Sequence, residues 1–268
     1  MIFVSSDDGL GSRSGDVDDA FAVAALLAGS WEVVLASVFG NTSEAQAYRN
    51  LHTLRDLMRA PVPVEHGATR RGEAGTPAAR ELARRKQPMT LVAIGPLTDL
   101  ASALTLDPTL ATRVKECVVV GGNLTSLGRF PPLWPHEFNF TADRKATRAV
   151  FSAGMPLTVV PLDVAGRFRL GRRELEAIEG PLGDYLRSGS ERWIRRTRFV
   201  HLRSEFAVYD LLAALAGLGR EGVTCERKLA RAHPSGRIVW NEGLEVEVVT
   251  GFDHARLVER FLALVNRA

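Results

Sequence analysis

Short apolar runs alternate with amphipathic segments along the first part of the chain. The runs Ile2–Ser6, Glu32–Val38 and Met89–Ile94 have the length and composition of buried strands. Between them, Asp18–Ala28 and Ser43–Arg59 carry apolar residues at helical spacing. Strands that alternate with helices need crossover connections, which produce a mostly parallel sheet. The pattern therefore predicts an α/β fold with an open, mostly parallel sheet flanked by helices.

The alternation continues to Asp163 and then gives way to a helical segment. Further strands are predicted at Val62–Glu65, Glu116–Val120 and Leu157–Leu162, and further helices at Pro77–Arg85, Thr98–Leu106 and Ala142–Ser152. Beyond Asp163 the pattern predicts helices at Arg172–Glu179, Leu182–Arg198 and Ser204–Leu218, strands near Lys228, at Arg237–Trp240 and Leu244–Val249, and a last helix at Ala255–Asn266. Because no linker or repeat interrupts the chain, we expect a single domain over residues 1–268.

Composition and charge narrow the class of protein. Hydrophobic residues make up 46%, charged residues 24%, and the net charge is only +3, which is ordinary for a globular enzyme. The most basic stretch, Arg192–Arg203, is interrupted by apolar residues and is typical of a solvated helix face rather than a nucleic-acid surface. Neither a signal peptide nor an apolar stretch of about 18 residues is present. These features predict a cytoplasmic enzyme without nucleic-acid or membrane partners.

Polar residues follow the predicted strands, where open parallel sheets bind their ligands. These groups are Ser5–Gly9, Gly40–Thr42, Gly95–Asp99, Gly121–Asn123 and Asp163. A glycine-rich phosphate loop with a lysine is not among them, which argues against a nucleoside triphosphate as ligand.

The first of these loops is unusually acidic. Five aspartates fall within thirteen residues: Asp7, Asp8, Asp16, Asp18 and Asp19. Capping of a helix accounts for about two of them. Crowded carboxylates repel one another, and a hard cation such as Ca²⁺ removes that repulsion, so the loop favours a metal site. Asp210, which follows Tyr209 in an apolar run, is either a cap-like group or a further ligand.

Five sequence blocks, in order, resemble those of the inosine-uridine type nucleoside hydrolases. Ser5–Gly9 and Asp18–Ala20 resemble the two halves of the family's Asp-x-Asp-Pro-Gly-x-Asp-Asp-Ala motif. The other blocks are Gly40–Asn41, Gly95–Ala101, Gly121–Gly122 and Glu137–Asn139, and Asp143, Ala146 and Asp163 continue the match. The likeness covers roughly residues 1–165 together with Asp210. It implies a Rossmann-like fold, hydrolysis of the N-glycosidic bond of ribonucleosides, a small-molecule nucleoside as partner, and a homodimer or tetramer.

The resemblance also implies a role for individual residues. The Ca²⁺ ligands would be Asp7, Asp19, Asp210 and the carbonyl of Ile94. Asp7 would also act as the general base for a Ca²⁺-bound water. The ribose contacts would be Asp18, Asn41, Glu137 and Asn139. We expect the other two acids, Asp8 and Asp16, to be turn and cap residues.

The chain departs from the family pattern in four places. Ser5 replaces an aspartate, Leu10–Val17 is an insertion, Arg70–Gly75 is a shortened loop, and Tyr209 replaces a histidine proposed as leaving-group acid. For Asp7 and Asp19 to converge, we expect the insertion to bulge away from the metal.

Because Tyr209 replaces the histidine, we interpret the part of the site that contacts the nucleobase differently. A tyrosine with an ordinary pKa of about 10 is a weak acid at neutral pH, but its ring can stack on a planar base. We therefore expect stacking by Tyr209, with Trp134 and Phe138 as further aromatic walls. His136 and His201 are alternative acids, although a surface or structural role is the simpler interpretation of each.

Two other functions remain open on the residues alone. One is a non-catalytic protein that binds ribose or a nucleoside, which the shortened loop and the missing histidine favour. The other is hydrolysis of a different N-ribosyl compound. A haloacid-dehalogenase-like phosphatase would need Asp-x-Asp directly after the first strand and a later lysine, and neither is clear.

Overall fold

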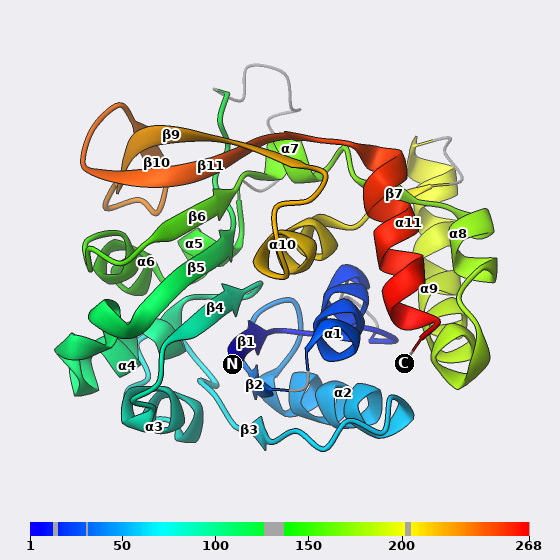
Figure 1. Ribbon diagram of the computed structural model, residues 1–268, viewed down its shortest axis with the longest axis horizontal. Coiled ribbons are helices and arrows are strands. Elements are labelled where there is room, and N and C mark those ends of the chain that lie inside the picture. Colours follow the sequence, from blue (N-terminus) through cyan, green and yellow to red (C-terminus); the bar gives the residue numbers. More distant parts are fainter. Residues whose placement is uncertain (13–15, 31, 126–136, 202–204, 268) are drawn as a thin grey trace.

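A mixed sheet of nine strands lies at the centre of the described residues. The computed structural model describes residues 1–12, 16–30, 32–125, 137–201 and 205–267. The strand order is β10-β9-β11-β6-β5-β4-β1-β2-β3 (Figure 1). The strands are β1 (Ile2–Ser6), β2 (Val33–Ser37), β3 (Val64–Glu65), β4 (Met89–Ala93), β5 (Val114–Val120), β6 (Leu157–Val160), β9 (Val223–Ala232), β10 (Ile238–Trp240) and β11 (Leu244–Phe252).

The direction of the strands confirms the predicted fold class. All pairings from β3 across the sheet to β11 are parallel, whereas β9 pairs antiparallel with both β11 and β10. The chain moves from β1 outward through β2 to β3, and then returns to place β4 on the other side of β1. Such a switch point opens a crevice at the carboxyl ends of β1 and β4, which is where open α/β sheets bind ligands.

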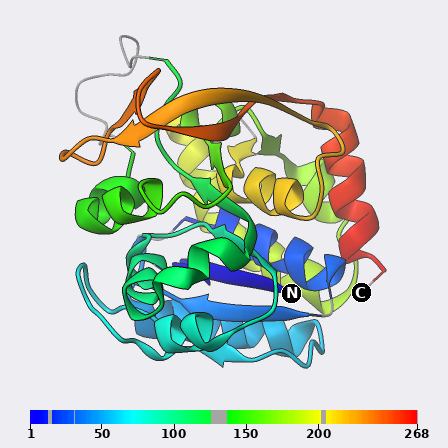
Figure 2. The ribbon, with the colours of Figure 1, turned by 60° about the vertical axis from the view of Figure 1, so that its left-hand side comes forward.

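Helices cover both faces of the sheet (Figures 1 and 2). Ile2 and Val4 on β1 point into an apolar core shared with α1, α2, α10 and α11, whereas Phe3 points to the opposite core, shared with α3, α4 and α6. The helices are α1 (Asp18–Gly29), α2 (Glu44–Leu57), α3 (Pro77–Arg84), α4 (Thr98–Leu106), the 3₁₀ helix η1 (Pro108–Arg113), α5 (Asn139–Ala142), α6 (Arg144–Phe151), α7 (Leu162–Ala165), α8 (Arg172–Glu176), α9 (Gly180–His201), α10 (Tyr209–Gly217) and α11 (His254–Val265). Across the described ranges, none of these helices has both the length and the apolar character needed to cross a membrane.

The C-terminal third differs from the sequence pattern in two details. The helix expected over Ser204–Leu218 begins only at Tyr209, because Phe206–Ala207 forms β8 and pairs with β7 (Arg169–Leu170). The strand expected near Lys228 is the ten-residue β9, in which five side chains are exposed and only one is buried. In both places the strand pairs with a segment distant in sequence. Local periodicity therefore missed β8 and did not give the full length of β9.

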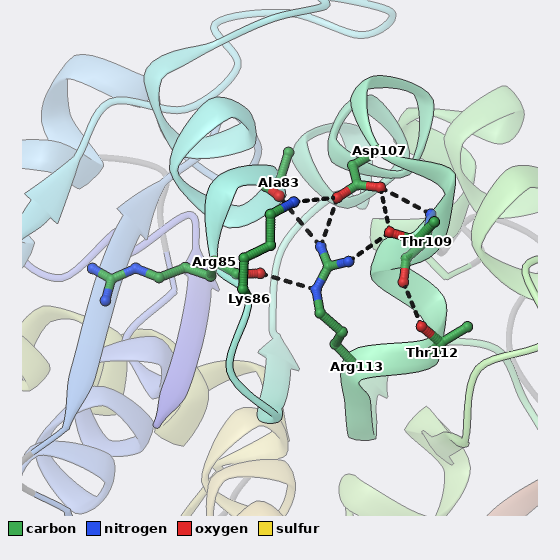
Figure 3. Close-up of polar contacts among 7 residues, drawn as sticks. All are labelled: Ala83, Arg85, Lys86, Asp107, Thr109, Thr112 and Arg113. Carbon is green, nitrogen blue, oxygen red and sulfur yellow. Dashed lines mark hydrogen bonds and ion pairs between the residues drawn. The ribbon is translucent and has the colours of Figure 1, made fainter.

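A network of opposite charges joins the ends of α3, α4 and η1 on the face away from α1 (Figure 3). The Asp107 carboxylate caps η1 by accepting from the Thr109 backbone N–H at 3.0 Å and from its hydroxyl at 2.6 Å. Lys86 and Arg113 also donate to Asp107, at 3.0 and 2.8 Å. Through the side-chain hydrogen bond from Thr109 above all, and through the two cations, the pKa of Asp107 lies well below its ordinary value.

Candidate active site

Four predicted site acids converge beyond the carboxyl end of β1. Asp7 follows β1 directly, Asp18 and Asp19 lie in the first turn of α1, and Asp210 lies in the first turn of α10. All four side chains are buried, with at most 5% of their surface exposed. The N-terminal turn of a helix is positively polarised, so α1 and α10 both favour acids at this place. Residues more than 190 positions apart in the sequence are thus neighbours, and the Asp210 backbone N–H contacts Asp18 directly.

Hydrogen bonds orient these acids but leave one oxygen of Asp7 and one of Asp19 without a partner among the described residues. Asp7 Oδ2 accepts from the Asn41 backbone N–H at 2.6 Å, and Asp19 Oδ1 accepts from the Ser6 hydroxyl at 2.7 Å. The Asp210 backbone N–H donates to Asp18 Oδ2 at 3.3 Å. Within the described residues, Asp7 Oδ1 and Asp19 Oδ2 are buried without a hydrogen-bond partner. Buried oxygens without a partner are rare, because their desolvation costs about 1–3 kcal/mol.

Two glycines make room for the Asp7 carboxylate. A Cβ added to Gly40, after β2, would lie 1.8 Å from Asp7 Oδ2. A Cβ added to Gly95, after β4, would lie 2.9 Å from Asp7 Oδ1. Contacts this short are sterically forbidden, so the Gly-Asn and Gly-Pro-Leu-Thr blocks both border the same carboxylate. The structure brings together three of the motif blocks that are separate in the sequence.

Burial and mutual repulsion raise the pKa of these acids. Burial raises the pKa of Asp7 to about 7, the hydrogen bond from Asn41 opposes this rise, and the charges of Asp18 and Asp8 add to it. Burial first, and then neighbouring acids, raise the pKa of Asp19 and of Asp210 well above the ordinary value. Carboxylates are hard oxygen ligands, so a divalent cation would relieve both the repulsion and the unpaired oxygens. Among the described residues, the carboxylates grouped closely enough to share one ion are those of Asp16, Asp18 and Asp19. Their oxygen ligands fit a hard cation such as Ca²⁺.

Asp16 contradicts one expectation from the sequence. Val17, rather than Asp16, precedes α1 as its cap residue, and no side chain caps that helix. Asp16 Oδ2 instead accepts a hydrogen bond from Asn41 Nδ2 at 2.9 Å. Carboxylate oxygens of Asp16, Asp18 and Asp19 lie within 4.8 Å of one another, so the end of the insertion turns toward the acids and not away from them. The cap role of Asp16 is therefore wrong, whereas residues 13–15, the middle of the insertion that was expected to bulge, lie outside the described residues.

The expected turn role of Asp8 is confirmed. Asp8 Oδ1 accepts from the Leu10 backbone N–H at 2.9 Å, which closes a short turn just after β1. Asn50 from α2 secures the same turn by donating to the carbonyls of Asp8 and Leu10 at 2.9 and 3.2 Å. Sequence analysis missed Asn50, because nothing near it in the chain indicates that it binds the first loop.

Glu137 and Asn139 lie just before and at the start of α5. Glu137 Oε1 accepts from the Phe140 N–H at 2.6 Å, and burial raises the pKa of Glu137 to about 8. Asn139 Nδ2 donates to the carbonyls of Ile94 and Val120, at 3.0 and 3.2 Å. The carbonyl of Ile94 therefore lies at the predicted edge of the sheet, with a side-chain donor already on it. The Val120 carbonyl, which sequence analysis did not single out, lies beside the same amide.

The aromatic residues are placed less uniformly than the acids. Tyr209 is the first residue of α10 and is half-buried, and a Cβ added to Gly166 would lie 3.0 Å from its ring. Burial, followed by the charge of Asp18, raises the pKa of Tyr209, so its hydroxyl is a weaker acid than a free tyrosine. Phe138 is 44% exposed at the start of α5. Trp134, His136 and the side chain of His201 lie outside the described part of the chain.

Comparison with known proteins identifies the family. The model of the inosine-uridine preferring nucleoside hydrolases matches residues 13–259, which is most of the chain. The chain belongs to this nucleoside hydrolase family.

Curated relatives within the family share about a third of their residues with the chain over the aligned part. The non-specific ribonucleoside hydrolase RihC of Klebsiella pneumoniae is 32% identical over an alignment of 184 residues, and the match covers 56% of this chain and 60% of the relative. The pyrimidine-specific ribonucleoside hydrolase RihA of Salmonella enteritidis is 30% identical over an alignment of 202 residues, and the match covers 62% of this chain and 64% of the relative. Uridine nucleosidase 1 of Arabidopsis thaliana is 28% identical over 59% of this chain and 57% of the relative. The chain thus matches about three fifths of the length of these relatives.

Solved structures of nucleoside hydrolases share the fold over the whole length. The plant nucleoside hydrolase PpNRh1 superposes with a TM-score of 0.84 at 19% identity, covering 100% of this chain and 99% of the other. The purine-preferring ribonucleoside hydrolase from Gardnerella vaginalis gives a TM-score of 0.80 at 20% identity, with the same coverage of both chains. At such identities the likeness demonstrates the Rossmann-like fold alone.

One departure from the nucleoside hydrolase pattern has a visible structural counterpart. Ser5 stands where the family has an aspartate, and its buried hydroxyl has no partner in the described ranges. The adjacent Ser6 supplies the hydroxyl that orients Asp19, a contact that sequence analysis did not foresee. The replacement removes one carboxylate from the end of β1, while the insertion adds another at Asp16.

Proposed function

We propose that the chain hydrolyses the N-glycosidic bond of ribonucleosides to ribose and free base. One observation carries the proposal. A buried carboxylate oxygen, Asp7 Oδ1, has no hydrogen-bond partner among the described residues and lies in a crevice with three further buried acids. The blocks around it are those by which the chain resembles nucleoside hydrolases, and the named relatives are hydrolases of ribonucleosides.

The metal we propose is Ca²⁺, held by Asp7, Asp19, Asp210 and a backbone carbonyl. Ile94 is the assigned carbonyl, and its position at the end of β4, beside the glycine that borders Asp7, supports the assignment. When bound, Ca²⁺ would neutralise the acids and contribute Lewis acidity to the site.

Asp7 is the proposed general base. Cleavage requires a water oxygen to bond to C1′ while the bond from C1′ to the base nitrogen breaks and its electron pair leaves with the base. The Asp7 carboxylate takes the proton of that water, and the hydrogen bond from Asn41 to Oδ2 holds the carboxylate in place. As positive charge grows on the ribose, the surrounding carboxylates stabilise it.

The proposed ribose contacts come from three separate segments of the chain. Asp18 lies beside Asp210 at the start of α1, and Asn41 lies beside Asp7 after β2. Glu137 and Asn139 are anchored at α5 by their own hydrogen bonds, so they present fixed groups to the sugar hydroxyls.

The leaving base is assigned to the side of Tyr209. The raised pKa of its hydroxyl argues against proton donation, and the ring remains available for stacking on a base. Phe138, which is 44% exposed, and Trp134 are the proposed further walls.

A substrate panel tests this function directly. The protein is incubated with purine and pyrimidine ribonucleosides, with Ca²⁺ or with chelator, and free ribose is measured. We expect release of ribose that the chelator abolishes. Binding of nucleosides without release from any of them would replace the proposal by a nucleoside-binding role, and release from another N-ribosyl compound alone would change the substrate class.

The cellular setting belongs to the same proposal. Cys117 and Cys225 are both free thiols, which supports the reducing cytoplasm as the site of action. We also propose that residues 1–268 fold as one domain and that the protein assembles as a homodimer or tetramer, as the family resemblance implies. Light scattering of the purified protein measures the mass that decides the last point.

A further inference from the structure

The insertion between Asp7 and Asp18 places one more carboxylate against the proposed metal ligands. Oxygens of Asp16, Asp18 and Asp19 lie within 4.8 Å of one another. Ca²⁺ binds its ligands at about 2.3–2.6 Å, so oxygens up to about 5 Å apart can share one ion. Asp16 is therefore within reach of an ion that Asp19 binds.

Two buried oxygens without a hydrogen-bond partner among the described residues indicate that Asp16 and Asp19 face a ligand. Asp16 Oδ1 is buried without a partner in the described residues, as is Asp19 Oδ2 on a side chain with no exposed surface. Burial, followed by the charges of Asp18, Asp7 and Asp8, raises the pKa of Asp16 well above its ordinary value. A cation shared by the two carboxylates would give unpartnered oxygens of this kind a ligand.

Asn41 holds Asp16 in this position. Its side-chain amide donates to Asp16 Oδ2 at 2.9 Å, while its backbone N–H donates to Asp7 Oδ2 at 2.6 Å. One residue thereby couples the inserted acid to the acid at the end of β1. The Asn41 amide is occupied by Asp16, which leaves it less free to bind a ribose hydroxyl.

We infer that Asp16 is an additional Ca²⁺ ligand supplied by the insertion, positioned by Asn41. This assignment rests on the proposed function, because it takes Asp19 to be a ligand of the same ion. A further carboxylate raises the charge and the oxygen count of the site, and both favour Ca²⁺ over Mg²⁺, which prefers fewer protein ligands and retains water.

Calorimetric titration of the metal-free protein with Ca²⁺ alone tests the assignment without any substrate. The variant Asp16→Asn is expected to weaken Ca²⁺ binding about 10- to 100-fold and to reduce the preference for Ca²⁺ over Mg²⁺. Asp16→Glu, which retains the charge, is expected to restore most of the affinity. The matched control is Asp8→Asn, which removes one buried charge from the same loop and is expected to change the dissociation constant less than about 3-fold.

The outcomes separate the two claims. Equal weakening by Asp16→Asn and Asp8→Asn, or no weakening by either, would overturn the assignment of Asp16. Asp19→Asn provides the reference, and we expect it to abolish measurable Ca²⁺ binding. If Asp19→Asn binds Ca²⁺ as the unchanged protein does, the metal site of the proposed function is itself wrong. Circular dichroism of each variant verifies that the fold is retained, and Asn is isosteric with Asp.

Discussion

Asp7 and Asp107 are the same residue type in opposite electrostatic settings. Asp107 is surrounded by donors from Thr109, Lys86 and Arg113, and its pKa lies well below the ordinary value (Figure 3). Asp7 is fully buried among other acids, and its pKa is raised to about 7. The first network is complete without a ligand, whereas the second has excess negative charge and unpaired oxygens.

The difference separates a structural site from a functional one. A carboxylate that stabilises the fold gathers cations and donors, and its charged form is favoured. The buried acids beyond β1 have the opposite surroundings, which disfavour their charged forms. A bound cation would stabilise those charged forms. The following experiments test this contrast, beginning with the largest expected effect.

Replacing the proposed base should produce the largest effect. We expect Asp7→Asn to lower kcat/KM for ribonucleosides by roughly 10²- to 10⁴-fold, because the water then has no proton acceptor. The same change removes a buried charge, so the metal-free variant should melt at the same temperature as the unchanged protein or at a higher one. Steady-state kinetics and thermal melts measure the two effects. Full activity of this variant would contradict the role of Asp7.

Metal and pH should act together on stability. The pKa of Asp7 and of Asp8 rises from 3.8 to about 7 in the folded state, so the metal-free fold binds more protons than the unfolded chain between these values. The free energy of unfolding of the metal-free protein should therefore fall as pH rises from about 4 to 8. Ca²⁺ at 100 times its dissociation constant should add about 2.7 kcal/mol.

Thermal melts at pH 5 and pH 8, with and without Ca²⁺, measure this coupling. At one fixed Ca²⁺ concentration, the stabilisation by Ca²⁺ should be larger at pH 8, because the acids are then charged without the ion and bind it more tightly. Equal melting temperatures across this range in chelator would show that the acids do not carry the predicted excess charge.

The tyrosine of the base site should have a moderate effect. Tyr209→Phe retains the ring and is expected to leave kcat nearly unchanged, whereas Tyr209→Ala should raise KM about 2- to 10-fold by removing the stacking surface. A large loss of kcat in the Phe variant, with unchanged KM, would identify the hydroxyl as the leaving-group acid after all.

Asp107 should have the smallest effect on chemistry. Asp107→Asn breaks the ion pairs to Lys86 and Arg113 and weakens the cap of η1. We expect the melting temperature to fall by roughly a few degrees while kcat/KM stays the same. A loss of activity comparable with that of Asp7→Asn would erase the proposed distinction between the two aspartates.

The sequence by itself determined the fold class, the family and the identity of most candidate residues. Alternating strands and helices predict the parallel sheet, because the periods of 2 and 3.6 residues are local properties. The acid-rich loop indicates a cation, since the repulsion of five nearby aspartates requires no knowledge of the fold. Asp210 was also recognisable locally as an acid in an apolar run, whereas the start of its helix at Tyr209 came only from the structure.

Only the tertiary structure decided which acids meet, and at which atoms. Asp16 was expected to cap α1, but its contact is Asn41, 25 positions away, and no local pattern encodes such a pairing. Asn50 holds the first loop from α2, and Asn139 joins the carbonyls of Ile94 and Val120, for the same reason. Side chains reach these partners because parallel strands end at one edge of a sheet, which makes distant residues neighbours.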